Sequence, residues 1–131
     1  MTASINKVYI QIGVIIILLG IVAGAFGAHF IESNYGERAS AIFDTASKYQ
    51  IYHGFGIIIL GILWDKLPRN YVKWIKYLFI SGILCFSGSL YLLAFKSSLG
   101  SLVKVIGPIT PIGGLLFIIG WFVFFLALRK K

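Results

Sequence analysis

Long runs of residues without charge constrain the fold of this 131-residue chain more than any other feature. Residues 8–28 and 109–128 contain no Asp, Glu, Lys or Arg, and residues 74–95 contain only Lys76. A helix that crosses the hydrocarbon core of a bilayer needs about 20 mostly apolar residues. Residues 49–64 are also uncharged, although the run is shorter. The sequence therefore predicts an all-α membrane protein, a four-helix bundle with spans over residues 8–28, 49–64, 74–95 and 109–128.

The composition excludes a soluble globular domain. The chain is 59% hydrophobic and 12% charged, whereas soluble domains are roughly 45–50% apolar and about 25% charged. The formal net charge is +8, but the cations lie between and after the apolar runs. Anionic lipid head groups, and not nucleic acid, are therefore the expected counter-charge. We expect a single multi-pass domain of the cell membrane.

The basic residues predict the orientation of the spans. With the N-terminus inside, the cytoplasmic Lys and Arg residues are Lys7, Lys66, Arg69, Lys73, Lys76, Arg129, Lys130 and Lys131. The residues on the outside are then Arg38, Lys48, Lys96 and Lys104. Cytoplasmic segments carry the excess of Lys and Arg, so the sequence predicts that both termini are cytoplasmic and that anionic lipids bind on that side.

Residues 37–48 carry a helical amphipathic pattern. Ile42, Phe43 and Ala46 recur at helical spacing, while Asp44 and Lys48 form an i,i+4 pair on the other face. This pattern predicts a short amphipathic helix that lies on the membrane surface and runs into the second span.

Two other segments each allow two interpretations. Residues 8–28 follow Lys7 and contain a passable cleavage site at 23–25, as a signal peptide does. An uncleaved helix agrees better with the even number of spans. Residues 96–108 are consistent with an extended external loop or with a short interfacial helix.

Small residues predict close packing between the spans. Gly20 and Gly24 form a GxxxG pair, the spacing that lets helix backbones approach closely in lipid. The contact is expected either within the chain or with a second copy in a homo-oligomer. The other glycines expected at helix contacts are Gly27, Gly88, Gly113 and Gly114.

Polar side chains interrupt the apolar runs in a few short motifs. Polar groups inside a membrane are costly and tend to mark function. The predicted topology brings these residues to the outer face, and they form the candidate ligand site: His29, Tyr49, Gln50, His53, Ser87, Ser89, Tyr91 and Thr110. Each has a structural alternative, since histidines and serines can bond helix carbonyls and tyrosines populate the aromatic belt.

The same motifs carry a family resemblance. GAFGAH at 24–29, YQxxH at 49–53, FSGSLY at 86–91 and TPxGG at 110–114 closely resemble the YgdD/YwdK-like family of small membrane proteins. The motifs occur in the same order, and the resemblance extends over about residues 8–128. It implies four membrane helices and does not imply an activity.

The favoured function is a non-enzymatic one, in which the outer polar cluster binds a lipid head group, a small ligand or a partner protein. One alternative is a small transporter or channel, although the acidic residues all fall outside the spans and a proton relay normally needs them within. Another is haem bound by His29 and His53. No paired carboxylates or triad predict catalysis, and no residue pattern predicts a metal site.

Overall fold

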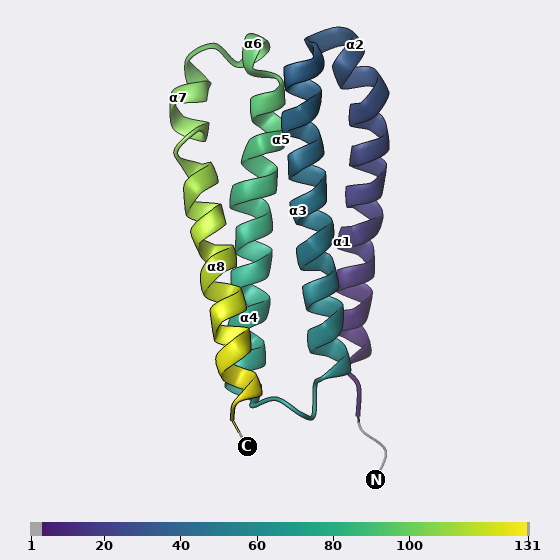
Figure 1. The fold of residues 1–131 in the computed structure, drawn as a ribbon, viewed down its shortest axis with the longest axis vertical. Coiled ribbons are helices and arrows are strands. Elements are labelled where there is room, and N and C mark those ends of the chain that lie inside the picture. The colour runs from purple at the N-terminus through teal and green to yellow at the C-terminus, as the bar shows by residue number, and fades with distance from the viewer. Residues whose placement is uncertain (1–3, 131) are drawn as a thin grey trace.

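The computed structural model describes residues 4–130, in which helices run side by side along one long axis (Figure 1). The elements in chain order are α1 (Lys7–Phe26), the π-helical η1 (Gly27–Ile31), α2 (Glu32–Tyr35), α3 (Glu37–Ile62), α4 (Arg69–Gly82), the π-helical η2 (Ile83–Ser87), α5 (Gly88–Ala94), α6 (Lys96–Leu99), the 3₁₀-helical η3 (Gly100–Leu102), α7 (Val103–Ile106) and α8 (Ile109–Leu128). Both termini lie at one end of the bundle, which we call the terminal end (Figure 1). The helices α2, α6 and α7 lie at the opposite end, which we call the α2 end.

Three helical stretches are long and apolar enough, by length and composition, to cross a membrane. They are Lys7–Tyr35, Arg69–Ala94 and Ile109–Leu128, and in the first and second a π-turn joins two α-helices end to end. They contain the predicted spans 8–28 and 109–128 and nearly all of 74–95. The all-helical prediction is confirmed for residues 4–130, where no strand occurs.

The predicted amphipathic helix is part of a longer one. Residues 37–48 run without a break into residues 49–62 as α3. They pack against η1, α2 and α5 instead of lying apart on a surface. The reason is that Ala39, Phe43 and Ala46 continue the buried face of α3, so its polar face is simply the exposed side of a bundle helix. Residues 37–48 thus run into the predicted second span as expected, but as a helix of the bundle instead of one lying on the membrane surface.

The bend before α3 depends on one glycine. Gly36 has φ 89° between α2 and α3, a conformation that glycine adopts without steric cost. The chain reverses direction there, so α3 returns antiparallel to α1 (Figure 1).

Small residues recur every seven positions where α1 and α3 meet. Gly13 faces Gly54, Gly20 faces Ser47, and Gly27 faces Ser40. The Ser47 hydroxyl donates to the Gly20 carbonyl at 2.7 Å, and a Cβ placed on Gly13 would lie 2.6 Å from the Gly54 carbonyl oxygen. The two backbones therefore approach closely along their whole contact, which is within one chain.

The GxxxG pair belongs to this contact. A Cβ on Gly20 would lie 2.7 Å from the Ile51 side chain, and a Cβ on Gly24 would lie 2.8 Å from the Ser47 hydroxyl. Both glycines thus face α3 of the same chain, as does Gly27, whose Cβ would meet the Phe43 ring.

A second pair of antiparallel helices packs around the ring of Phe79. The ring is fully buried on α4 and lies against Gly56 of α3 and Gly120 of α8, where an added Cβ would come within 2.6 and 2.7 Å of it. Further along, Gly82 accommodates the Phe117 ring and Gly113 lies on the backbone of Phe86. Bulky rings seated on glycines hold α3, α4 and α8 together.

Gly88 does not share this role. A Cβ there would meet only the Ile83 carbonyl of its own helix, at 3.9 Å, which corrects the expectation of a helix contact. The preceding π-turn η2 holds an extra residue, and this rotates the residues that follow it by about 100° relative to an uninterrupted α-helix.

Adjacent glycines on α8 provide a matched test of the packing. A Cβ on Gly113 would lie 2.7 Å from the Phe86 Cα and closer still to its backbone nitrogen, whereas a Cβ on Gly114 would lie 3.7 Å from the Phe86 ring. We expect Gly113→Ala to destabilise the fold by about 1–3 kcal/mol, the usual cost of overpacking, because backbone cannot move aside as a side chain can. Gly114→Ala should unfold like the wild type in thermal melts in detergent. Equal melting temperatures for the two variants would contradict this packing.

Candidate functional site

Gln50 links three helices through its buried side chain amide. Its Nε2 donates to the Ile16 carbonyl of α1 at 2.9 Å, and its Oε1 accepts from the Tyr91 hydroxyl of α5 at 2.7 Å. Ser47, one turn away on α3, likewise donates its hydroxyl to a carbonyl of α1, that of Gly20. These polar groups are satisfied within the protein, so they hold α1, α3 and α5 in register.

Ser89 and Thr110 form a second pair, between α5 and α8, with their hydroxyl oxygens 2.6 Å apart. Ser89 also lies 3.0 Å from the Phe86 carbonyl. A carbonyl can only accept, so Ser89 donates to Phe86 and accepts from Thr110. Ser87, in the π-turn η2, is fully buried, and within residues 4–130 its hydroxyl has no hydrogen-bond partner.

His53 is held on both ring nitrogens. Nδ1 lies 2.6 Å from the Tyr49 carbonyl oxygen and must therefore donate, while Nε2 accepts from the Trp121 indole N–H at 3.1 Å. The imidazole is thus neutral and carries its proton on Nδ1. It stacks on the Phe117 ring, with centroids 3.4 Å apart and planes 11° from parallel. This arrangement positions the ring firmly and leaves neither nitrogen free for a ligand.

The predicted site residues do not all lie at one level of the bundle. Gly54 faces Gly13 near the terminal end of α1, and Ser40 faces Gly27 near the α2 end. His53 therefore lies about 20 Å along the axis from Ser40, at 1.5 Å per residue. Gln50 is bonded to Tyr91 and Ser89 to Thr110, and His53 lies one turn from Gln50 on α3. That these residues form one ligand site at the outer face stays a prediction.

His29 lies apart from the other candidates. It is exposed on η1, just beyond Gly27, which Ser40 contacts. The axial separation of about 20 Å from His53 is far greater than the span of two ligands on one haem iron. The geometry therefore contradicts a shared haem for His29 and His53. Within residues 4–130, no three His, Cys, Asp or Glu side chains come together as metal ligands would.

A groove of about 590 Å³ opens on the side of the bundle between α3 and α8. Its lining residues are Tyr49, Tyr52, His53, Phe86, Gly114, Phe117, Ile118 and Trp121. Since both His53 nitrogens are already bonded, the groove presents aromatic and aliphatic walls. Such a surface suits an apolar chain or ring better than a polar solute.

A second cavity, of about 400 Å³, lies at the α2 end, where α3 faces α5 and α6. Its lining residues are Tyr35, Arg38, Ala39, Ile42, Leu93, Ala94, Lys96 and Ser97. It differs from the groove in having two cations in its wall.

Comparison with known proteins places the chain in a family. Residues 23–114 match a family model described as a protein of unknown function (DUF423), which is more than half of the chain. The chain belongs to this family. The matched region begins just before the first polar motif, at 24–29, and ends with the glycines of the last, at 110–114.

Relatives of the chain match it over nearly their whole length. A UPF0382 membrane protein of Staphylococcus epidermidis is 41% identical over 124 residues, which is 95% of this chain and 97% of the relative. The UPF0382 membrane protein YwdK of Bacillus subtilis is 37% identical over 125 residues, covering 95% and 98%. No solved structure matches. The predicted resemblance to the YwdK-like family is thus confirmed, and the chain is a membrane protein of that family.

The sequence does not reveal the hydrogen-bond partners of the polar residues. Trp121 follows Phe117 by four residues and Gly114 by seven, so helical spacing alone places all three on one face of α8. Nothing in the spacing indicates that this face meets His53. The two π-turns, at 27–31 and 83–87, fall within or beside polar motifs and were not predicted either.

Removing one hydroxyl tests the link between helices. Tyr91→Phe leaves the Gln50 Oε1 buried without its donor, and we expect it to cost about 1 kcal/mol, within the range for hydrogen bonds between membrane helices. Tyr77→Phe is the control, because Tyr77 is exposed. Denaturant titration in detergent measures both. If the two variants unfold alike, the Tyr91–Gln50 bond does not support the fold.

Proposed function

We propose that this protein is a non-enzymatic, multi-pass protein of the cell membrane that binds a lipid through the groove between α3 and α8. The observation that carries the proposal is the groove itself, which is about 590 Å³ in volume and walled by aromatic side chains. Ligand pockets are commonly about 300–1,000 Å³ and mostly apolar. In a bilayer a groove open to the side receives its ligand directly from the surrounding lipid.

The pairing of the polar side chains favours an apolar ligand over a polar one. A polar solute at Gln50 or His53 would have to break bonds to Tyr91 or Trp121. Leaving a buried donor or acceptor unsatisfied costs about 1–3 kcal/mol. An acyl chain in the groove needs no such exchange, since it contacts rings and aliphatic groups only.

This proposal includes a fourth membrane crossing by α3. Its polar first half keeps α3 outside the set of long apolar helices, yet it is packed along α1 for the full length of their contact. Both termini then lie on one side (Figure 1). The excess of Lys and Arg at the terminal end supports a cytoplasmic location for them, and anionic lipid on that side.

Aromatic and basic side chains at the terminal end support this placement. Arg69 lies 3.8 Å from the Trp64 ring centroid, and the Lys76 amine lies 5.0 Å from that of Tyr9. Such pairs are typical of the boundary between hydrocarbon and head groups.

Labelling of introduced cysteines tests the orientation. In a Cys85→Ala background, Lys66→Cys and Ser98→Cys place single thiols at exposed positions of opposite ends. A membrane-impermeant maleimide should label Ser98→Cys in intact cells and Lys66→Cys only after permeabilisation. The reverse pattern would overturn the proposed orientation.

Filling the groove tests lipid binding. Gly114 lines the groove, and an added methyl group fits beside Phe86, so Gly114→Ala should bind lipid as the wild type does. Gly114→Leu places a branched side chain in the groove and should lower phospholipid binding roughly tenfold, or about 1.4 kcal/mol. Native mass spectrometry of the protein titrated with phospholipid measures the bound fraction. Unchanged binding by a folded Gly114→Leu would refute the groove as the site.

A further inference from the structure

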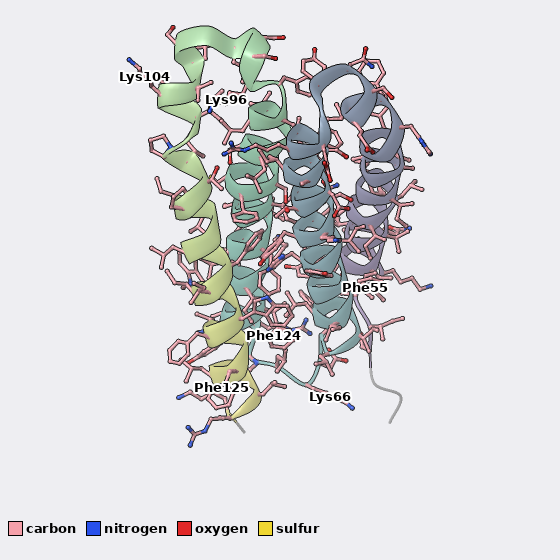
Figure 2. All side chains as sticks on the ribbon, turned by 45° about the horizontal axis from the view of Figure 1, so that its top comes forward. Phe55, Lys66, Lys96, Lys104, Phe124 and Phe125 are labelled. Atoms are coloured by element: carbon pink, nitrogen blue, oxygen red, sulfur yellow. The ribbon has the colours of Figure 1, made fainter. Side chains whose placement is uncertain are left out.

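Two cations from different elements line the cavity at the α2 end. Arg38 lies at the start of α3 and Lys96 at the start of α6, and the cavity wall also includes the hydroxyl-bearing Ser97. Figure 2 shows Lys96 at this end of the bundle, beside α5 and α6, while Lys104 points outward from α7. The rest of the wall is formed mainly by apolar side chains.

The positive charge of this cavity is not neutralised by the protein. In the part of the chain that the structure describes, the ion pairs are Asp44–Lys48 and Asp65–Arg69, so Arg38 and Lys96 have no carboxylate partner. The acidic residues of this end, Glu32, Glu37 and Asp44, line a different hollow, of about 320 Å³. The carboxylates of this end thus line a hollow that includes neither Arg38 nor Lys96.

The basic cavity and the aromatic groove follow one another along the same seam. On α3, Ile42 lines the cavity and Tyr49 lines the groove; on the neighbouring column, Leu93 lines the cavity and Phe86 lines the groove. Each pair is separated by seven residues, which places both members on one helix face about 10 Å apart along the axis. The cavity therefore lies about two helical turns beyond the groove, on the same side of α3.

The distance between Arg38 and the groove matches the depth of one lipid leaflet with its head group. His53, in the groove, follows Arg38 by fifteen residues on α3, or about 22 Å. Half of the hydrocarbon core is about 15 Å thick, and the head-group region lies outside it. A lipid with its phosphate beside Arg38 extends its chains to the level of the groove.

We propose that the cavity at the α2 end binds the phosphate of an anionic phospholipid whose acyl chain occupies the groove, an inference that rests on the proposed function. Arg38 offers a planar fork of donors that matches phosphate oxygens, and Lys96 adds a second positive charge. The acidic side chains lie in the other hollow, so the ammonium of a zwitterionic head group finds no partner here. The site therefore selects anionic over zwitterionic lipid.

The experiment titrates the full-length protein in detergent with phosphatidylglycerol and, separately, with phosphatidylcholine, and counts bound lipid by native mass spectrometry. The wild type should prefer phosphatidylglycerol roughly tenfold, and the Arg38→Gln/Lys96→Gln variant should lose that preference. Lys104→Gln, which removes a cation that points away from the cavity, should keep it. Arg38→Lys/Lys96→Arg, which preserves both charges, should restore most of it. Circular dichroism and thermal melts verify that each variant is folded.

The outcomes separate this inference from the proposed function. Equal loss of both lipids in Gly114→Leu, with no effect of Arg38→Gln/Lys96→Gln, would keep the groove and refute the head-group site. No effect of any of these variants would refute both. Inorganic phosphate at millimolar concentration should not displace phosphatidylglycerol, because the acyl chain supplies part of the affinity. Displacement by inorganic phosphate would assign the cavity to a free anion and overturn the lipid proposal.

Discussion

The close approach of the α1 and α3 backbones is the contact on which the rest of the structure depends. Glycines at every seventh position of α1 and the adjoining η1 let the hydroxyls of Ser40 and Ser47 and the amide of Gln50 reach their carbonyls. Gln50 in turn positions Tyr91, which joins α5 to this pair. In lipid there is little hydrophobic force between helices, so close packing and hydrogen bonds of this kind hold a bundle together.

One consequence is that the polar side chains support the fold, while mostly apolar side chains line the groove between α3 and α8. His53 is bonded on both nitrogens and stacked on Phe117, so it contributes a flat, neutral wall to the groove. Arg38 and Lys96, which have no carboxylate partner among the described residues, line the cavity at the α2 end. This division between an apolar groove and a basic cavity matches the two parts of an anionic lipid.

Much of the architecture follows from sequence, because apolar length and glycine spacing act locally. The GxxxG pair predicted a close contact, but spacing on one helix does not reveal which helix faces it. Residues 37–48 were predicted as helix from their periodicity, whereas their location depends on packing against other elements. The bonded partners of the polar residues could not be predicted, because the register between helices is a tertiary property. The π-turns shift that register further, and Gly88 turns away from the contact expected of it.

The most direct test of this account is an experimental density map of the protein crystallised from a lipid mesophase that contains phosphatidylglycerol. We predict elongated density in the groove beside Phe117 that continues toward Arg38 and Lys96, with Gln50 and His53 bonded within the protein. A groove closed by side chains or by a second copy, with Gln50 and His53 turned toward a polar ligand, would contradict it.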